Sequence, residues 1–148
     1  MQTHPKILLA EDDDDDAYFI GKAVLEIFPD FEYERLNNGS RLLASLQKQN
    51  SNVAFVLLDL NMPSLNGRDT LCAIRETYGD KFPVYILSNS NHLHEKEFCL
   101  QNGANTYYVK PISYEGYQSI INQCNYEYLE QEAVKVNHPN KTSGNSLT

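Results

Sequence analysis

The sequence predicts an α/β domain in which five parallel strands alternate with five helices as a doubly wound sheet. Short apolar segments alternate with longer segments whose apolar residues recur at helical spacing. No internal repeat interrupts this alternation. One strand segment, residues 53–58 (VAFVLL), is apolar throughout, which is typical of a strand that is covered on both faces. Together these observations indicate a parallel sheet with helices on both sides.

Five short segments predict the strands. Most are rich in Leu, Val, Ile or Tyr, and the second alternates between polar and apolar residues, as a half-exposed strand does. The predicted strands cover residues 6–10 (KILLA), 31–36 (FEYERL), 53–58 (VAFVLL), 83–87 (PVYIL) and 106–109 (TYYV).

Each predicted strand is followed by a segment with helical periodicity. In the first of these segments, Ala17, Ile20, Val24 and Ile27 share one apolar face. Gly103 is a typical residue for ending the fourth helix. The predicted helices cover residues 14–28, 39–49, 66–78, 93–102 and 113–132.

The length and composition fit one domain and exclude several functions. We expect residues 1–134 to form a single domain and the polar residues 135–148 to form a disordered tail. A net charge of −8 argues against direct binding to nucleic acid or to anionic membrane surfaces. No segment has the ~20 consecutive apolar residues of a membrane span. Three widely spaced cysteines without a CxxC motif predict reduced thiols and a cytoplasmic location.

Polar side chains follow four of the predicted strands. Binding sites of parallel sheets lie beyond the carboxyl ends of the strands, so these side chains share one pocket if the four strands are neighbours. They are Glu11 and Asp12 after the first strand, Asp59 after the third, Ser88 after the fourth and Lys110 after the fifth.

This combination of side chains predicts phosphoryl chemistry. Crowded carboxylates repel one another, and Mg²⁺, which prefers oxygen ligands, removes that repulsion. A lysine, a hydroxyl and a cation together bind phosphoryl oxygens. A carboxylate between them can attack phosphorus and form an acyl phosphate. Asp59 is therefore the predicted nucleophile for phosphoryl transfer.

The segments that carry these residues resemble the receiver domain of bacterial response regulators, which has the flavodoxin-like fold of CheY. The resemblance spans residues 6 to about 130 and implies the strand order 2-1-3-4-5. The four matching segments occur in the family's order and spacing: ILLAEDD at 7–13, VLLDLNMPSLNG at 56–67, YILSNS at 85–90 and YYVKPI at 107–112.

The resemblance implies roles for the acidic residues and the lysine. Asp59 would accept a phosphoryl group from a histidine kinase or a phosphotransfer protein. Mg²⁺, or Mn²⁺ in its place, would be bound by Glu11, Asp12, Asp59 and the backbone carbonyl of Asn61. Lys110 would pair first with Asp59 and then with the phosphoryl group.

Four further residues receive roles from the resemblance. Ser88 would turn toward a phosphoryl oxygen, and Tyr107 would rotate inward behind it. Asn89 is larger than the residue usual at its position, and would either narrow access to the phosphoryl group or hydrogen-bond to it. The peptide bond between Lys110 and Pro111 would be cis, as is usual in the family and least costly before proline.

The acidic run continues from Asp12 into the first predicted helix. Asp13 could contribute to the metal site through water. We expect Asp14, Asp15 and Asp16 to form a solvent-exposed first turn with its N-cap. Their charge would increase the negative potential that attracts Mg²⁺.

The function implied by the resemblance is that of a stand-alone, single-domain response regulator in a two-component phosphorelay. It would be a phosphoacceptor and not a turnover enzyme. Its output would be contact between a downstream protein and the face made by the fourth helix, the fifth strand and the fifth helix. Direct binding to nucleic acid or membrane is not expected, and a homodimer is left open.

Two alternative functions involve related sites. A pseudo-receiver binds partners without phosphorylation, but such domains usually lack the acidic pair, the acceptor aspartate or the lysine. A haloacid-dehalogenase-like phosphatase also uses an Asp, a hydroxyl, a Lys and Mg²⁺. It needs an acid two residues after the nucleophile to protonate the leaving group, and Asn61 occupies that position.

Overall fold

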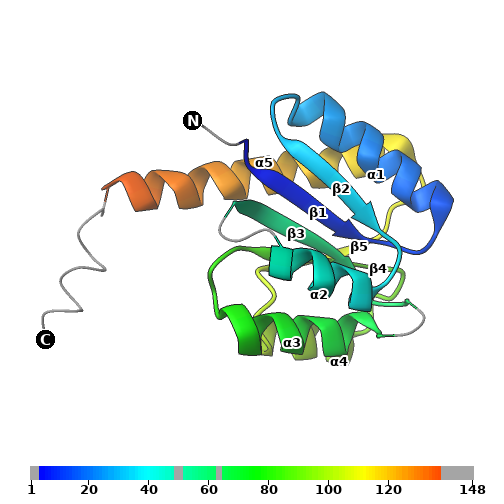
Figure 1. Ribbon diagram of the computed structural model, residues 1–148. Coiled ribbons are helices and arrows are strands. Elements are labelled where there is room, and N and C mark those ends of the chain that lie inside the picture. The colour runs from blue at the N-terminus through cyan, green and yellow to red at the C-terminus, as the bar shows by residue number, and fades with distance from the viewer. Residues whose placement is uncertain (1–3, 49–51, 63–64, 138–148) are drawn as a thin grey trace, which may run out of the picture.

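Five parallel strands form one sheet in the order β2-β1-β3-β4-β5. This arrangement, in a computed structural model that describes residues 4–48, 52–62 and 65–137, confirms the predicted fold class and strand order (Figure 1). The strands are β1 (Lys6–Ala10), β2 (Glu32–Leu36), β3 (Val53–Asp59), β4 (Val84–Ser88) and β5 (Thr106–Val109).

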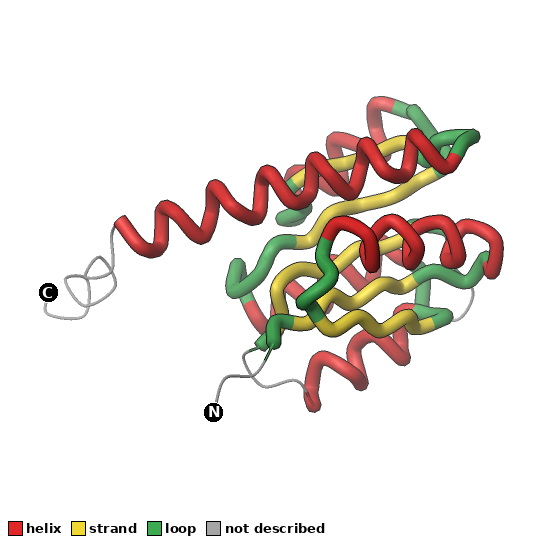
Figure 2. The backbone as a smooth tube through the Cα atoms, turned by 90° about the horizontal axis from the view of Figure 1, so that it is seen from above, coloured by secondary structure: helices red, strands yellow, loops and turns green. Residues whose placement is uncertain are grey.

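The helices cover both faces of this sheet. One face packs against α1 and α5, and the opposite face packs against α2, α3 and α4. Figure 2 shows the strands as one layer beside these helices. The helices are α1 (Asp14–Ile27), α2 (Gly39–Lys48), α3 (Gly67–Tyr78), α4 (Leu93–Gln101) and α5 (Tyr114–Asn137).

The two cores follow from the alternation of side chains along the strands. In β1, Ile7 and Leu9 join the core beneath α1 and α5, whereas Leu8 and Ala10 join the opposite core. All four are fully buried. A strand that is buried on both faces must be apolar throughout, which explains the sequence of β1 and of the adjacent β3.

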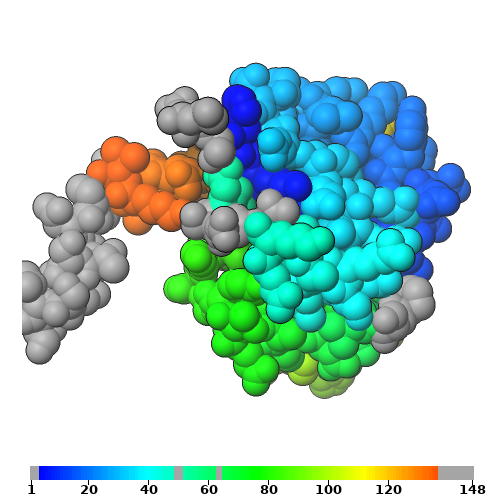
Figure 3. Space-filling model, in the orientation of Figure 1, coloured from blue at the N-terminus to red at the C-terminus, as the bar shows by residue number. Residues whose placement is uncertain are grey.

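The end of α5 differs from the prediction. The helix continues to Asn137 instead of ending at residue 132, so residues 135–137 of the predicted tail are helical. Residues 138–148 lie outside the described part of the chain. Val134 and Val136 in this extension are exposed, and the final turns project from the body of the molecule (Figure 3).

The strand register brings the predicted functional residues to one edge. Ala10 pairs with Leu58, Asp59 with Leu87, and Ser88 with Val109. Glu11 and Lys110 directly follow two of these strands. The carboxyl ends of four neighbouring strands therefore meet around a small region in which their side chains can interact.

Within the described ranges, no helix is both long and apolar enough to cross a lipid bilayer.

Candidate functional site

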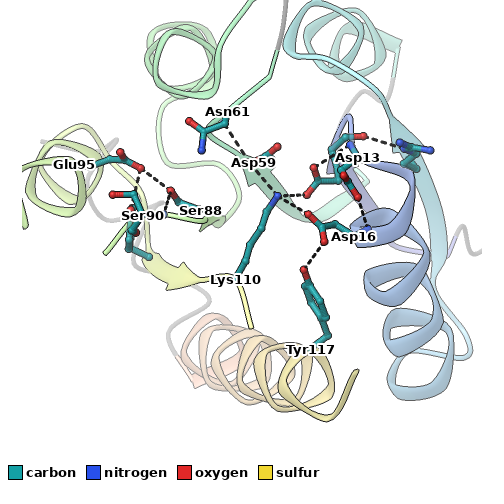
Figure 4. A network of polar contacts seen from close by, with 12 residues as sticks. Asp13, Asp16, Asp59, Asn61, Ser88, Ser90, Glu95, Lys110 and Tyr117 are labelled. Atoms are coloured by element: carbon teal, nitrogen blue, oxygen red, sulfur yellow. Dashed lines mark hydrogen bonds and ion pairs between the residues drawn. The ribbon is translucent and has the colours of Figure 1, made fainter. Parts of the chain in front are cut away.

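A buried lysine lies between two buried carboxylates at this edge of the sheet. Lys110 Nζ is 2.8 Å from Glu11 Oε1 and 3.3 Å from Asp59 Oδ1. The Lys110 side chain is 4% exposed, and Glu11 and Asp59 are 0% and 1% exposed. The backbone amide of Asn61 donates a hydrogen bond to Asp59 Oδ1 at 3.2 Å, which helps to orient the carboxylate (Figure 4).

The carboxylates in this cluster carry more negative charge than Lys110 can balance. Burial, followed by the nearby Asp59, raises the pKa of Glu11 to about 8. Burial also raises the pKa of Asp59, although Lys110 and other partners act in the opposite direction. For Lys110, burial lowers the pKa, but the bond to Glu11 and the charge of Asp59 outweigh it and raise the pKa.

The donor atoms at this site fit a small divalent cation. Glu11, Asp12 and Asp59 each place a carboxylate oxygen so that all three oxygens lie within 4.8 Å of one another. Asp12 is exposed, whereas the other two are buried, so the group opens to solvent on one side. Hard oxygen donors of this kind suit Mg²⁺ or Mn²⁺, and a cation would relieve the repulsion between them.

Asp16 also belongs to this cluster, and the prediction that it is solvent-exposed is wrong. Asp16 Oδ2 lies 3.0 Å from Lys110 Nζ, and the Tyr117 hydroxyl donates to Asp16 Oδ1 at 3.1 Å. The N-cap of α1 is Asp13, whose side chain accepts a hydrogen bond from the amide of Asp16. Asp16 lies four residues before the buried Ile20, so helical spacing could have placed it on the inner face.

Ser88 and Tyr107 are joined by Glu95, a residue that no sequence pattern singles out. The Ser88 hydroxyl donates to Glu95 Oε1 at 2.6 Å. The Tyr107 hydroxyl lies 2.6 Å from the carbonyl oxygen of Ser90 and 3.0 Å from Glu95 Oε1. Tyr107 is buried, so its ring points inward.

The remaining two predicted residues lie at the margin of the site. Asn89 is exposed, and its two predicted roles stay predictions. The predicted cis peptide bond before Pro111 is wrong, because the described residues contain no cis peptide bond. The bond between Lys110 and Pro111 has the trans conformation, which X–Pro bonds favour by about 0.5–1 kcal/mol.

Comparisons with known proteins agree with this geometry. Residues 7–122 match the family described as "Response regulator receiver domain". A curated relative, the transcriptional regulatory protein CpxR homolog of Haemophilus influenzae, is 36% identical over 106 residues. This match covers 72% of the present chain and 44% of the relative. The chain thus spans about half the length of the first curated relatives that it matches.

Solved structures share the fold. The phosphorylated cyanobacterial phytochrome response regulator RcpA superimposes with a TM-score of 0.77 at 26% identity, covering 87% of this chain and 96% of RcpA. The Mn²⁺-bound form of response regulator Rcp1 has a TM-score of 0.70 at 27% identity, covering 78% of this chain and 91% of Rcp1.

Receiver domains are phosphoacceptor signalling domains, generally not turnover enzymes, and they bind Mg²⁺ at an acidic cluster. Three observations agree with membership of this family: the match over residues 7–122, the strand order, and the acidic cluster beside a lysine. The chain belongs to the response regulator receiver domain family of two-component signalling.

Proposed function

We propose that this chain is a phosphorylation-controlled response regulator whose phosphoacceptor is Asp59. The observation that carries the proposal is the Asp59 carboxylate, which is buried at the sheet edge with Lys110 Nζ 3.3 Å from its Oδ1. The donor would be a phosphohistidine on a histidine kinase or a phosphotransfer protein. We place the reaction in the cytoplasm, which suits the free thiols of all three cysteines.

The proposed transfer breaks one bond and forms one. A carboxylate oxygen of Asp59 attacks phosphorus to form the O–P bond of an aspartyl phosphate. The P–N bond of the donor breaks, and the imidazole leaves with the bonding electrons. Lys110 lies beside the attacking carboxylate and would stabilise negative charge on the phosphoryl oxygens.

Glu11, Asp12, Asp59 and the backbone carbonyl of Asn61 would hold the divalent cation, Mg²⁺ or Mn²⁺. The first three fit because their carboxylate oxygens already lie close together. When bound, the cation would neutralise charge on the carboxylates and on the incoming phosphoryl group. Glu11 and Asp59 are buried away from bulk water. The attraction between the cation and these carboxylates is therefore stronger than it would be at the surface.

The phosphorylated site would change the protein through Ser88 and Tyr107. Ser88 would donate its hydroxyl proton to a phosphoryl oxygen, and the change would reach α4, β5 and α5. We propose that this face binds a downstream protein. Neither Asn61 nor Ser90 is a carboxylate that could act as a strong general base toward water, so we expect the aspartyl phosphate to be hydrolysed slowly.

Intact-protein mass spectrometry after incubation with acetyl phosphate tests the proposal. The wild-type protein should gain one phosphoryl group with Mg²⁺ and none when the cation is chelated. Asp59→Asn should gain none, because its amide cannot attack phosphorus. Asp15→Asn is the matched control: it removes an exposed carboxylate nearby and should react as the wild type does. A wild-type protein that stays unmodified, with this donor and with a phosphorylated kinase, would instead favour a phosphorylation-independent interaction module.

Asp16→Asn should weaken Mg²⁺ binding about fivefold, which corresponds to about 1 kcal/mol. The substitution removes a negative charge near the cation site and frees Lys110 to pair more closely with Glu11 and Asp59, so both effects act against the cation. Isothermal titration calorimetry with MgCl₂ measures the affinity. Asp15→Asn controls for the loss of one acid from the same turn, and equal affinities for the two variants would contradict the role given to Asp16.

A further inference from the structure

The carboxylate of Glu95 connects α4 to both residues that the receiver switch would use. Glu95 is the third residue of α4 and is half-buried. Its Oε1 atom lies 2.6 Å from Ser88 Oγ and 3.0 Å from the Tyr107 hydroxyl. Figure 4 shows Glu95 reaching Ser88 from the side away from Lys110.

The hydrogen-bonding capacity of Ser88 is already in use. Its single hydroxyl proton is donated to Glu95, and its oxygen accepts from the amide of Ser90 at 3.1 Å. Ser88 is fully buried, so water cannot readily replace these partners. A hydrogen bond from a hydroxyl to a carboxylate is short and strong, and 2.6 Å is typical of it. Ser88 must therefore break this bond before its proton can reach a phosphoryl oxygen.

Tyr107 is less dependent on Glu95. Its hydroxyl has one proton and two acceptors, and the carbonyl of Ser90 is the nearer of them. This bond to the backbone can keep the ring inward when Glu95 moves. Ser88, at 2.6 Å from Glu95 Oε1, is thus the partner that Glu95 holds more tightly.

We propose that Glu95 is a positioning residue that holds the Ser88 hydroxyl away from Asp59 and competes with the phosphoryl group for its proton. This inference rests on the proposed function of Asp59. It adds an energetic cost to the switch, because each phosphorylation must first break the hydrogen bond between Ser88 and Glu95 of α4. It also links the chemistry to the signalling face, since the first turn of α4 loses its tie to β4 when Ser88 leaves.

The rate of Mg²⁺-dependent phosphorylation by acetyl phosphate tests this competition. Glu95→Ala should accelerate the reaction about tenfold, because the Ser88 proton is then free to stabilise the phosphoryl oxygens. In a Ser88→Ala background, the same substitution should change the rate less than twofold. This dependence on Ser88 separates competition for the hydroxyl from a general loss of structure.

A matched control tests whether the loss of any negative charge from α4 changes the rate. Glu97→Ala deletes an exposed carboxylate from the same helix and should change the rate less than twofold. If Glu95→Ala accelerates the reaction equally with and without Ser88, Glu95 acts only through its charge and the inference is overturned. An unchanged rate in the Glu95→Ala protein overturns it as well.

A measurement without phosphodonor separates failure of this inference from failure of the proposed function. The amide of Lys96 bonds to the carbonyl of His92 in the first turn of α4. Its hydrogen exchange should be at least fivefold faster in Glu95→Ala and in Ser88→Ala than in the wild type or in Glu97→Ala. If the wild type accepts no phosphoryl group, the proposed function fails. Unchanged exchange in both variants shows instead that Glu95 does not restrain α4 through Ser88.

Discussion

Replacing Lys110 with methionine is expected to lower the free energy of unfolding by about 3 kcal/mol at neutral pH without Mg²⁺. Methionine fills much of the same space but leaves Glu11 and Asp59 buried without their cation. The contacts of Lys110 Nζ with Glu11 at 2.8 Å, with Asp16 at 3.0 Å and with Asp59 at 3.3 Å all disappear. Removing one member of a buried charge cluster is costly because the opposite charges remain desolvated.

The loss of unfolding free energy in Lys110→Met should increase as pH rises. In the folded wild type, the pKa of Glu11 is raised from 4.5 to about 8, and that of Asp59 is also raised. A carboxyl group with a raised folded-state pKa favours folding below its unfolded-state value, and this contribution is lost as pH rises through the folded-state value. Without Lys110 both pKa values should rise further. The deficit of the variant should therefore grow as pH rises through the folded-state pKa values of the wild type, and the contribution of Glu11 to it should appear above about pH 8.

Urea denaturation at several pH values measures this effect, with and without Mg²⁺. Added Mg²⁺ should recover part of the lost stability, because a cation at the carboxylates replaces the missing positive charge. Lys81→Met, which removes an exposed ammonium, should stay within about 0.5 kcal/mol of the wild type. A Lys110→Met protein as stable as the wild type at pH 8 without Mg²⁺ would show that Lys110 does not compensate these acids.

The meeting of Asp59 and Lys110 could be predicted from strand periodicity together with the strand order that the family resemblance implies. Buried strands have a clear apolar pattern, and parallel pairing brings their carboxyl ends to one edge. Each residue directly after such a strand is then placed at that edge. The boundaries of β1 and β5 were predicted to the residue, and the order of the strands followed from the family resemblance.

Helical spacing indicates the inner face for Asp16, but the partners of Asp16 and of Glu95 depend on contacts that periodicity does not encode. Each lies in the first turn of a helix, where acidic residues are common for reasons of capping and helix dipole alone. Their partners, Lys110 and Ser88, lie on other elements, and side-chain packing decides which acid turns inward. The end of α5 was misjudged for a different reason: its last turns expose Val134 and Val136, so no apolar face marks them as helical.

The second large effect on stability is expected for a substitution at Gly67, where α3 begins directly beside β3, the strand that ends in Asp59. Gly67→Ala should lower the free energy of unfolding by about 3 kcal/mol. An added Cβ atom would lie 2.5 Å from Leu60 Cα and closer still to the carbonyl oxygen of Asp59. Both are backbone atoms of the sheet edge, so they cannot rotate away as the end of a flexible side chain could.

The clash in Gly67→Ala should also slow the phosphorylation of Asp59. The amide of Gly67 donates to the carbonyl oxygen of Leu60 at 3.0 Å, which holds the start of α3 against the end of β3. Pushing these segments apart moves the backbone that orients Asp59, including the Asn61 amide that bonds to its carboxylate. We therefore expect slower phosphorylation of the folded variant, by tenfold or more, since small misplacements of a reacting group are costly.

Gly21→Ala is the matched control for this substitution. Gly21 lies inside α1, where the nearest atoms to an added Cβ would belong to the flexible Tyr33 side chain, at 3.3 Å. A small shift of that ring, together with the better helix propensity of alanine, should keep the stability within about 1 kcal/mol of the wild type. Thermal denaturation and the acetyl phosphate assay compare the two variants. Equal stability and equal rates would show that the contact between α3 and β3 can relax, and that Asp59 is positioned by Lys110 and Asn61 rather than by the tight start of α3.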